Sequence, residues 1–367
     1  MSFEGKQENM SRFHPLRVAS MTRETRDAVV VTFEVPEAER AVFRFKQGQH
    51  LTVRAELDGE EIRRSYSICS APFENKLCIA VKRVQDGVFS TWVNQHLTPG
   101  HVVECMAPSG HFHVPLEPES KRHHVAFAAG SGITPVISII KATLDAEPTS
   151  RFTLIYGNRA SSSVIFKEEL SNLKDIYLDR FNLVFILSRE QQDIELFNGR
   201  IDGAKCDALL KKWIDPAGID VAYICGPQGM MEEVSNSLQA HGVSRDRIKM
   251  ELFASGQLRG ARQRPEIAAS VNHECRVTII QDGRRREFTT EKNRHTLLES
   301  ALEQGIELPY SCKGGVCSSC RCKMTAGEVD MDVNFALEDY EVARGFILTC
   351  QSYPLSSEVV LDFDQES

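Results

Sequence analysis

The sequence predicts a multi-domain protein with an antiparallel β-barrel domain, an α/β domain built on a parallel sheet, and a smaller α+β domain. Three observations support this order. Up to about residue 118, short alternating apolar and polar runs are broken by turn signals, as in antiparallel strands. From residue 121 onward, apolar runs alternate with predicted helices over residues 134–146, 163–173 and 228–241, as in a parallel sheet. The third domain opens with two strand-like runs around the turn signal Asp282-Gly283.

These changes place the domains at residues 10–118, 119–253 and 273–363. Residues 254–272 are polar and rich in Arg, with almost no aromatic or large aliphatic side chain. We interpret this stretch as a linker that lets the third domain move. Two or three domains agree with a length of 367 residues.

Composition favours a globular protein of the cytoplasm. The chain is 42% hydrophobic and 26% charged, and no apolar run is long enough to span a membrane. The N-terminus lacks the apolar core of a signal peptide. Eleven cysteines, an odd number scattered through apolar segments, do not suggest a disulfide scaffold, so we expect a reducing compartment.

Negative charge is concentrated at the C-terminal end of the chain. The formal net charge is −8, and residues 273–367 hold 10 basic against 17 acidic side chains. Such a surface makes nucleic acid an improbable partner. The acidic residues before Cys350 are either a solvated face or a docking patch for a protein partner. They are Glu328, Asp330, Asp332, Glu338, Asp339 and Glu341.

In the first domain, the clearest predicted strands cover residues 29–34, 51–56, 62–68 and 77–84. The third of these carries Arg64-Ser65-Tyr66-Ser67, which resembles the R-x-Y-S signature of the ferredoxin–NADP+ reductase superfamily. The resemblance implies that Arg64 binds the pyrophosphate of FAD and that Tyr66 stacks on the flavin ring. It also implies that the Ser67 hydroxyl reaches the flavin nitrogen that receives hydride, which makes Ser67 a catalytic candidate.

A second flavin segment follows at Gly87-Val88-Phe89-Ser90-Thr91, ahead of an amphipathic helix. A helix start behind a glycine and hydroxyl residues is suited to an anion, and the resemblance places the flavin diphosphate there. Ser90 alone also fits an ordinary helix cap. The resemblance lines the ribityl and adenine side of FAD with Val81, Lys82 and Val84.

The second domain contains Gly130-Ser131-Gly132-Ile133-Thr134-Pro135 directly after a predicted strand. The glycines allow a coenzyme pyrophosphate to approach backbone N–H groups at the start of a helix. Its last strand ends in Cys225-Gly226-Pro227, which in the superfamily holds the nicotinamide edge. Cys225 is therefore either a positioning group near the hydride donor or a small buried apolar residue. Phe253 lies where relatives place an aromatic ring over the flavin, but it also fits a core position.

The choice of coenzyme depends on the end of the predicted strand 183–187. Ser188-Arg189 follows it and resembles the pair that binds the 2′-phosphate of NADPH, with Arg159 and Arg200 as possible helpers. An NADH site usually offers a carboxylate to the free ribose hydroxyls. Glu190, the next residue, could supply such a carboxylate, so NADH stays an alternative coenzyme, although NADPH is favoured.

The third domain carries Cys312, Cys317, Cys320 and Cys350, spaced C-x4-C-x2-C with a distant fourth cysteine. This is the ligand spacing of a plant-type 2Fe-2S ferredoxin. A structural zinc site or buried free thiols are the alternatives, but zinc sites prefer two C-x2-C pairs and this loop has one. The resemblance implies a β-grasp fold for this domain.

The order flavin, nicotinamide, ferredoxin resembles that of oxygenase reductases over residues 12–363. The reductase subunits of phenylacetyl-CoA epoxidase complexes are similar to this chain over residues 312–322, 327–332, 334–338 and 341–351. Steroid 9α-hydroxylase reductases share the domain order and have similar motifs. The resemblance implies that electrons pass from NADPH through FAD and the cluster to a partner oxygenase. A reductase for another metalloprotein, such as a hybrid-cluster protein fed by NADH, and a redox-sensing flavoprotein are the other possibilities.

Overall fold

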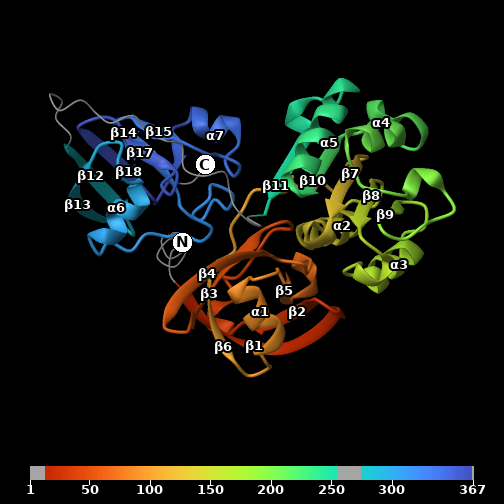
Figure 1. Cartoon of the computed structure of the whole chain (residues 1–367), viewed down its shortest axis with the longest axis horizontal. Coiled ribbons are helices and arrows are strands. Elements are labelled where there is room, and N and C mark those ends of the chain that lie inside the picture. The colour runs from red at the N-terminus through yellow and green to blue at the C-terminus, as the bar shows by residue number, and fades with distance from the viewer. Residues whose placement is uncertain (1–12, 254–273, 366–367) are drawn as a thin grey trace. The chain divides into compact units, whose positions relative to one another are not determined.

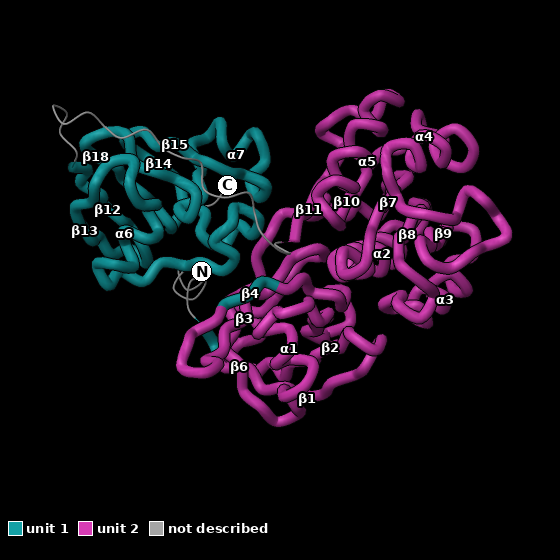
Figure 2. Tube along the Cα trace, in the orientation of Figure 1, with its two compact units in different colours: residues 1–14, 63–65, 254–367 teal, residues 15–62, 66–253 magenta. Residues whose placement is uncertain are grey.

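The computed structural model describes residues 13–253 and 274–365, so the predicted linker at 254–272 lies outside the described residues. Two compact units are present (Figure 2). One comprises residues 15–62 and 66–253, which make up most of the first two predicted domains. Of the described residues, the other comprises 13–14, 63–65 and 274–365. In both described stretches, no helix combines the length and apolar character needed to cross a membrane.

The first domain is a six-stranded antiparallel sheet in the order β4-β3-β6-β1-β2-β5 (Figure 1). A bridge between Ile68, just after β4, and Ile79 in β5 joins the two outer strands, so the sheet closes as the predicted barrel. Alternating residues of β2 and β5 fill the interior, and helix α1 (Val88–Gln95) adds Phe89 and Val93. The strands are β1 (Phe13–Thr25), β2 (Ala28–Glu34), β3 (His50–Leu57), β4 (Glu60–Ser67), β5 (Leu77–Lys82) and β6 (Val102–Met106).

The second domain is a parallel five-stranded sheet in the order β11-β10-β7-β8-β9, as predicted. Its strands are β7 (His123–Ala129), β8 (Arg151–Asn158), β9 (Phe181–Leu187), β10 (Val221–Gly226) and β11 (Ile248–Leu252). The connecting helices are α2 (Ile133–Ala146), α3 (Lys167–Ile176), α4 (Gly203–Lys212) and α5 (Gln228–Ala240). Figure 1 shows the resulting order of strands and helices.

One predicted helix begins later than expected. The sequence suggested a helix over residues 163–173, but α3 starts at Lys167. Residues 161–163 instead form a short 3-10 turn, and Phe166 has a left-handed φ of 60° that an α-helix does not accept. The buried Phe166 ring compensates for this backbone conformation by packing in the core of the domain.

The C-terminal unit has a mixed sheet in the order β13-β12-β18-β14-β16, with α6 (Leu297–Glu303) packed on it. β12 and β13 form the predicted hairpin, and Asp282 and Gly283 both have the positive φ that this tight turn requires. The unit therefore has the predicted α+β class. Its other elements are β12 (Glu274–Gln281), β13 (Arg284–Glu291), β14 (Arg321–Ala326), β15 (Val329–Met331), α7 (Asp339–Ala343), β16 (Phe346–Leu348), β17 (Ser352–Pro354) and β18 (Glu358–Asp362).

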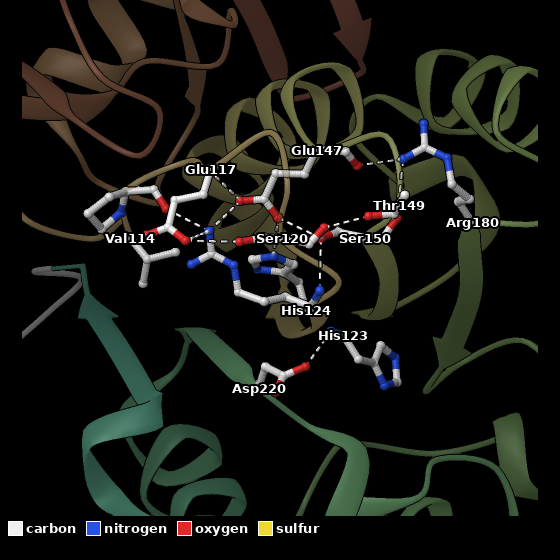
Figure 3. A network of polar contacts seen from close by, with 12 residues as sticks. Val114, Glu117, Ser120, His123, His124, Glu147, Thr149, Ser150, Arg180 and Asp220 are labelled. Carbon is white, nitrogen blue, oxygen red and sulfur yellow. Dashed lines mark hydrogen bonds and ion pairs between the residues drawn. The ribbon is translucent and has the colours of Figure 1, made fainter.

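A buried polar network stabilises the start of the parallel sheet (Figure 3). Glu147, at the end of α2, is fully buried and accepts hydrogen bonds from Arg122 at 2.6 Å and His124 at 3.1 Å. It also accepts from the Ser150 hydroxyl at 2.7 Å and from the Glu117 backbone N–H at 3.1 Å. Because Glu117 belongs to the segment that leads from the barrel into β7, this carboxylate ties the connection between the two domains to the sheet.

Replacing Glu147 with Ala is expected to lower the free energy of unfolding by roughly 3–5 kcal/mol, because Arg122 and His124 lose a buried partner. Urea denaturation followed by circular dichroism measures this change. Asp145→Ala, at an exposed acidic position two residues earlier, is the matched control and should have little effect. Equal midpoints for the two variants would contradict the structural role of the network.

Candidate functional site

The R-x-Y-S segment lies at the end of β4, and its side chains have different surroundings. Arg64 is exposed, and one of its guanidinium nitrogens donates to the Arg63 carbonyl. The half-buried Tyr66 ring lies 5.9 Å from the Phe89 ring of α1, centroid to centroid. Ser67 is buried, and its hydroxyl donates to the Glu251 carboxylate at 3.2 Å. An exposed cation, an aromatic face and a buried hydroxyl thus follow one another along a few residues of strand.

The second flavin segment forms a tight turn at the start of α1. Gly87 is the N-cap residue, and the Ser90 hydroxyl donates to its carbonyl and accepts from the Val84 N–H at 3.0 Å. A side chain at position 87 would approach the Ser90 oxygen to 2.7 Å, so glycine fits this turn best. The Ser90 hydroxyl therefore closes the loop, and the predicted contact with the flavin diphosphate would be made by the N–H groups of the helix start.

The predicted adenine-side residues are not equivalent. Val81 is fully buried in the barrel core, so its side chain faces away from any ligand, and its carbonyl accepts from Asn94. Val84 is half exposed, and Lys82 is partly exposed with its ammonium near Gly130 of the second domain. Lys82 thus adds a positive charge next to the predicted coenzyme turn.

The glycine turn of the second domain packs directly against the end of β10. A Cβ atom on Gly132 would lie 2.1 Å from the Cys225 carbonyl oxygen, so only glycine allows this approach. Gly130 has a φ of +55° and accepts a hydrogen bond from the Tyr156 hydroxyl. The Thr134 hydroxyl donates to the Ser131 carbonyl at 3.0 Å and closes the first turn of α2. Two predicted coenzyme segments, distant in sequence, are therefore brought together.

Three side chains meet where the barrel and the sheet join: Ser67, Cys225 and Glu251. Cys225 in β10 and Glu251 in β11 are paired neighbours in the parallel sheet. Burial raises the pKa of Glu251 to about 8, although the hydrogen bond from Ser67 acts in the opposite direction. Burial also raises the pKa of the Cys225 thiol, so the thiol stays protonated. Ser67 and Cys225, the two residues predicted to lie near the transferred hydride, thus have a common neighbour in Glu251, whose carboxyl is neutral near pH 7.

Sequence reasoning did not assign a role to Glu251. The only available signal was its place two residues before Phe253, on the same side of an extended segment. Phe253 is half-buried and packs against the core of the second domain. Its predicted contact with the flavin stays a prediction.

The predicted 2′-phosphate residues lie at the carboxyl ends of two neighbouring strands. Arg189 is exposed, and its backbone N–H donates to the carbonyl of Arg159, which follows β8 and is also exposed. Ser188 follows β9 and donates its N–H to the Asn158 carbonyl. The Glu190 carboxylate accepts from the Ser161 N–H at 2.7 Å, so it closes a backbone turn. This edge therefore presents the guanidinium groups of Arg159 and Arg189, and the nearby Glu190 carboxylate already has a backbone partner.

The four predicted cluster ligands converge in two pairs. Cys312 is in hydrogen-bonding contact with Cys317, and Cys320 with Cys350. Two pairs of thiolates fit a centre with two irons, in which each iron takes two cysteine sulfurs. The Gly314 N–H donates to the Cys312 sulfur at 3.3 Å.

The backbone of the cluster loop lies close to the chain segment around Val333. Gly315 has a φ of +74°, and a Cβ atom there would lie 2.8 Å from the Val333 carbonyl. Backbone N–H groups directed at sulfur stabilise a reduced cluster. The loop and its ligands therefore fit the implied group.

One of the acidic residues before Cys350 is not at the surface. Glu341 is fully buried and accepts from Arg321 at 2.9 Å, and its other oxygen accepts from the Glu338 N–H. It stabilises α7 and cannot contribute to a docking patch. The expectation that Glu341 belongs with the surface acids is therefore wrong.

These sites define a class of protein: a pyridine-nucleotide-dependent reductase with flavin and iron–sulfur modules. Three family models match the chain, described as an oxidoreductase FAD-binding domain at residues 15–114, an oxidoreductase NAD-binding domain at 127–236 and a 2Fe-2S iron–sulfur cluster binding domain at 279–355. The chain belongs to the family of oxygenase reductase components that carry these three modules in this order.

Relatives of this family match over nearly the full length. One of the subunits of 1,2-phenylacetyl-CoA epoxidase from Escherichia coli strain K12 is 44% identical over 358 residues, covering 97% of this chain and 99% of the relative. The ferredoxin reductase component of 3-ketosteroid-9-alpha-monooxygenase from Rhodococcus rhodochrous is 33% identical, covering 96% and 97%. The solved structure of phthalate dioxygenase reductase matches with a TM-score of 0.57 and 26% identity, covering 96% and 98%.

The chain is thus an NAD(P)H-dependent oxidoreductase that uses FAD and a 2Fe-2S cluster to deliver electrons to an oxygenase. When bound, FAD accepts a hydride from the coenzyme and releases electrons singly, and the cluster carries one electron at a time. The protein supplies binding, orientation and a controlled charge around the reacting atoms.

The raised pKa of Glu251 predicts how flavin reduction depends on pH. A hydride brings negative charge into the site, so the neutral carboxyl favours its arrival and the ionised carboxylate opposes it. The rate of flavin reduction should therefore fall as the pH rises through about 8, by roughly tenfold, which corresponds to about 1.4 kcal/mol. Glu251→Gln should keep the rate of the low-pH form and remove the step.

Anaerobic stopped-flow measurement of flavin bleaching by NADPH between about pH 6 and 9.5 tests this prediction. Exposed Glu232→Gln, in α5, is the matched control and should keep the pH dependence of the parent protein. An unchanged step in Glu251→Gln would assign the titration to another group.

Proposed function

We propose that this reductase serves a phenylacetyl-CoA epoxidase and draws its electrons from NADPH. The observation that carries the proposal is 44% identity, across 97% of the chain, to one of the subunits of that enzyme. The similar segments 312–322, 327–332, 334–338 and 341–351, the last of which contains Cys350, add support from the sequence. A steroid 9α-hydroxylase is the second candidate, because a relative from such a system matches 96% of the chain at 33% identity.

The proposed roles of the site residues follow the geometry described above. Ser67 and Cys225 would flank the atoms between which hydride moves, with Glu251 between them. FAD would be held by Arg64, Tyr66, Ser67, Lys82, Val84, Gly87, Ser90 and Phe253, and by the backbone of Val81. The coenzyme would be held by Gly130, Gly132, Thr134, Ser188, Arg189, Cys225, Gly226 and Pro227. The cluster ligands would be Cys312, Cys317, Cys320 and Cys350.

The proposed docking surface for the oxygenase is the acidic side of the ferredoxin unit. Residues 328–339 place several carboxylates close in sequence to α7 and to the loop that holds the cluster. The Phe335 N–H donates to the Gly315 carbonyl of that loop at 2.9 Å, so this segment adjoins the ligands directly. A partner docked on this segment would lie close to the cluster, which favours electron transfer. The negative charge of the segment would make docking weaker at high salt. A cytoplasmic location fits these proposals.

A reconstituted assay tests the partner and the coenzyme together. The purified protein is mixed with the oxygenase component of a phenylacetyl-CoA epoxidase, phenylacetyl-CoA and either NADPH or NADH. Epoxide formation coupled to NADPH oxidation is expected. If the flavin and the cluster are reduced but no epoxide forms, the partner assignment fails while the reductase class stands, and the steroid hydroxylase is then the system to test.

The coenzyme preference makes its own prediction. Arg189→Ala should raise the Michaelis constant for NADPH by roughly tenfold or more, because a charge-assisted contact with the 2′-phosphate is lost. The constant for NADH should change little. Steady-state kinetics with an artificial one-electron acceptor measures both, and Arg151→Ala, an exposed residue at the opposite end of β8, is the control. An equal effect on the two coenzymes would rule out a 2′-phosphate site at Arg189.

A further inference from the structure

Lys141 is a buried lysine that neither the sequence motifs nor the proposed site involve. It lies on α2 with 7% of its surface exposed, and its ammonium donates to the carboxylates of Glu74 and Glu169, each at 2.9 Å. Burial alone would lower the pKa of Lys141, but the two carboxylates raise it above its ordinary value, so the side chain stays charged. A buried cation is stable only while such partners hold it.

The two partners come from different parts of the molecule. Glu74 ends the short 3-10 turn between β4 and β5 of the barrel, whereas Glu169 lies on α3 of the parallel-sheet domain. The same Glu74 carboxylate also accepts the Ala71 N–H and so closes that turn. Lys141 therefore joins the helix of one domain to a folded turn of the other.

A second contact lies one helical turn away on the same face of α2. The hydroxyl of Ser138, which is fully buried, donates to the Ser70 carbonyl at 2.7 Å. The Ser70 hydroxyl in turn donates to the Lys76 carbonyl and accepts from the Cys78 N–H, which fixes the β4–β5 connection from within the barrel. Two polar contacts three residues apart thus hold α2 along residues 70–74.

Both ends of this arrangement lead to the proposed reaction site. On the barrel side, residues 70–74 follow Tyr66 and Ser67 by a few positions in a chain segment bridged to β5. On the other side, α2 begins at the glycine turn whose Gly132 touches Cys225. Lys141 is seven residues beyond Thr134, about 10 Å along one helix. A tilt of α2 would therefore shift the nicotinamide side of the site relative to the flavin side.

We propose that Lys141 is a positioning residue for hydride transfer: by holding α2 against the barrel through Glu74, it sets the approach of the coenzyme to the flavin. It does not contact either cofactor site. Misplacement by about 1 Å can slow a positioned reaction by about a hundredfold. The proposal concerns flavin reduction by NAD(P)H and is independent of which oxygenase is served.

The test is anaerobic stopped-flow reduction of the FAD-loaded, full-length protein by NADPH. Lys141→Met should lower the rate constant at saturating coenzyme by roughly 10- to 100-fold, with a smaller change in the dissociation constant of NADPH. Lys141→Arg, which keeps the charge, should recover most of the rate. Lys174→Met on α3, where the ammonium donates to the Leu178 carbonyl, is the matched control and should behave like the parent protein.

Three further readouts separate positioning from general damage. FAD content, the visible spectrum of the cluster and the rate of cluster reduction by dithionite should match the parent in Lys141→Met. An unchanged rate of flavin reduction would overturn the proposal, as would a slow rate that Lys141→Arg does not improve. If Lys141→Met does not fold, Ser138→Ala decides: a several-fold slower flavin reduction supports the proposal, and a parental rate overturns it.

Discussion

The approach of Gly132 to the Cys225 carbonyl is the constraint on which the proposed reaction site depends. Because no side chain fits between them, the glycine turn and the end of β10 form one surface. β11 lies next to β10 and places Glu251 beside Cys225, and Glu251 receives the hydrogen bond from Ser67 of the barrel. A close backbone contact inside one domain thus positions the groups through which that domain meets the other.

Three ionisable side chains, Glu251, Lys141 and Glu147, differ in protonation state because their surroundings differ. Glu251 is half-buried, and desolvation raises its pKa so that the carboxyl is neutral near pH 7. Lys141, in contrast, is buried with two carboxylates and stays ionised. Glu147 is surrounded by donors, and these lower its pKa even though burial alone would raise it. A neutral carboxyl such as Glu251 suits a site that receives negative charge during hydride transfer. The ionised and hydrogen-bonded side chains of Lys141 and Glu147 instead hold separate chain segments together.

The fold class and the barrel and sheet strands could be predicted from the sequence, because they depend on local patterns of apolar and polar residues. The spacing of the four cysteines likewise allowed them to be named as candidate cluster ligands. Glu251, Lys141 and Glu147 could not be predicted in their roles. Each acts through partners far away in the chain, and a buried acid or base looks like a surface residue until the packing is known. The late start of α3 had the same origin, since tertiary packing of Phe166 overrides helical periodicity.

Flavin and coenzyme are expected to meet at Ser67, Cys225 and Glu251, and a crystal structure of the protein with FAD and NADP+ bound tests this most directly. We expect the flavin ring to lie against Tyr66 with its hydride-accepting edge at the Ser67 hydroxyl. The nicotinamide should lie between Cys225 and the flavin in at least one bound state. A flavin ring bound away from the Ser67–Glu251 pair, with that pair still hydrogen-bonded, would contradict this arrangement.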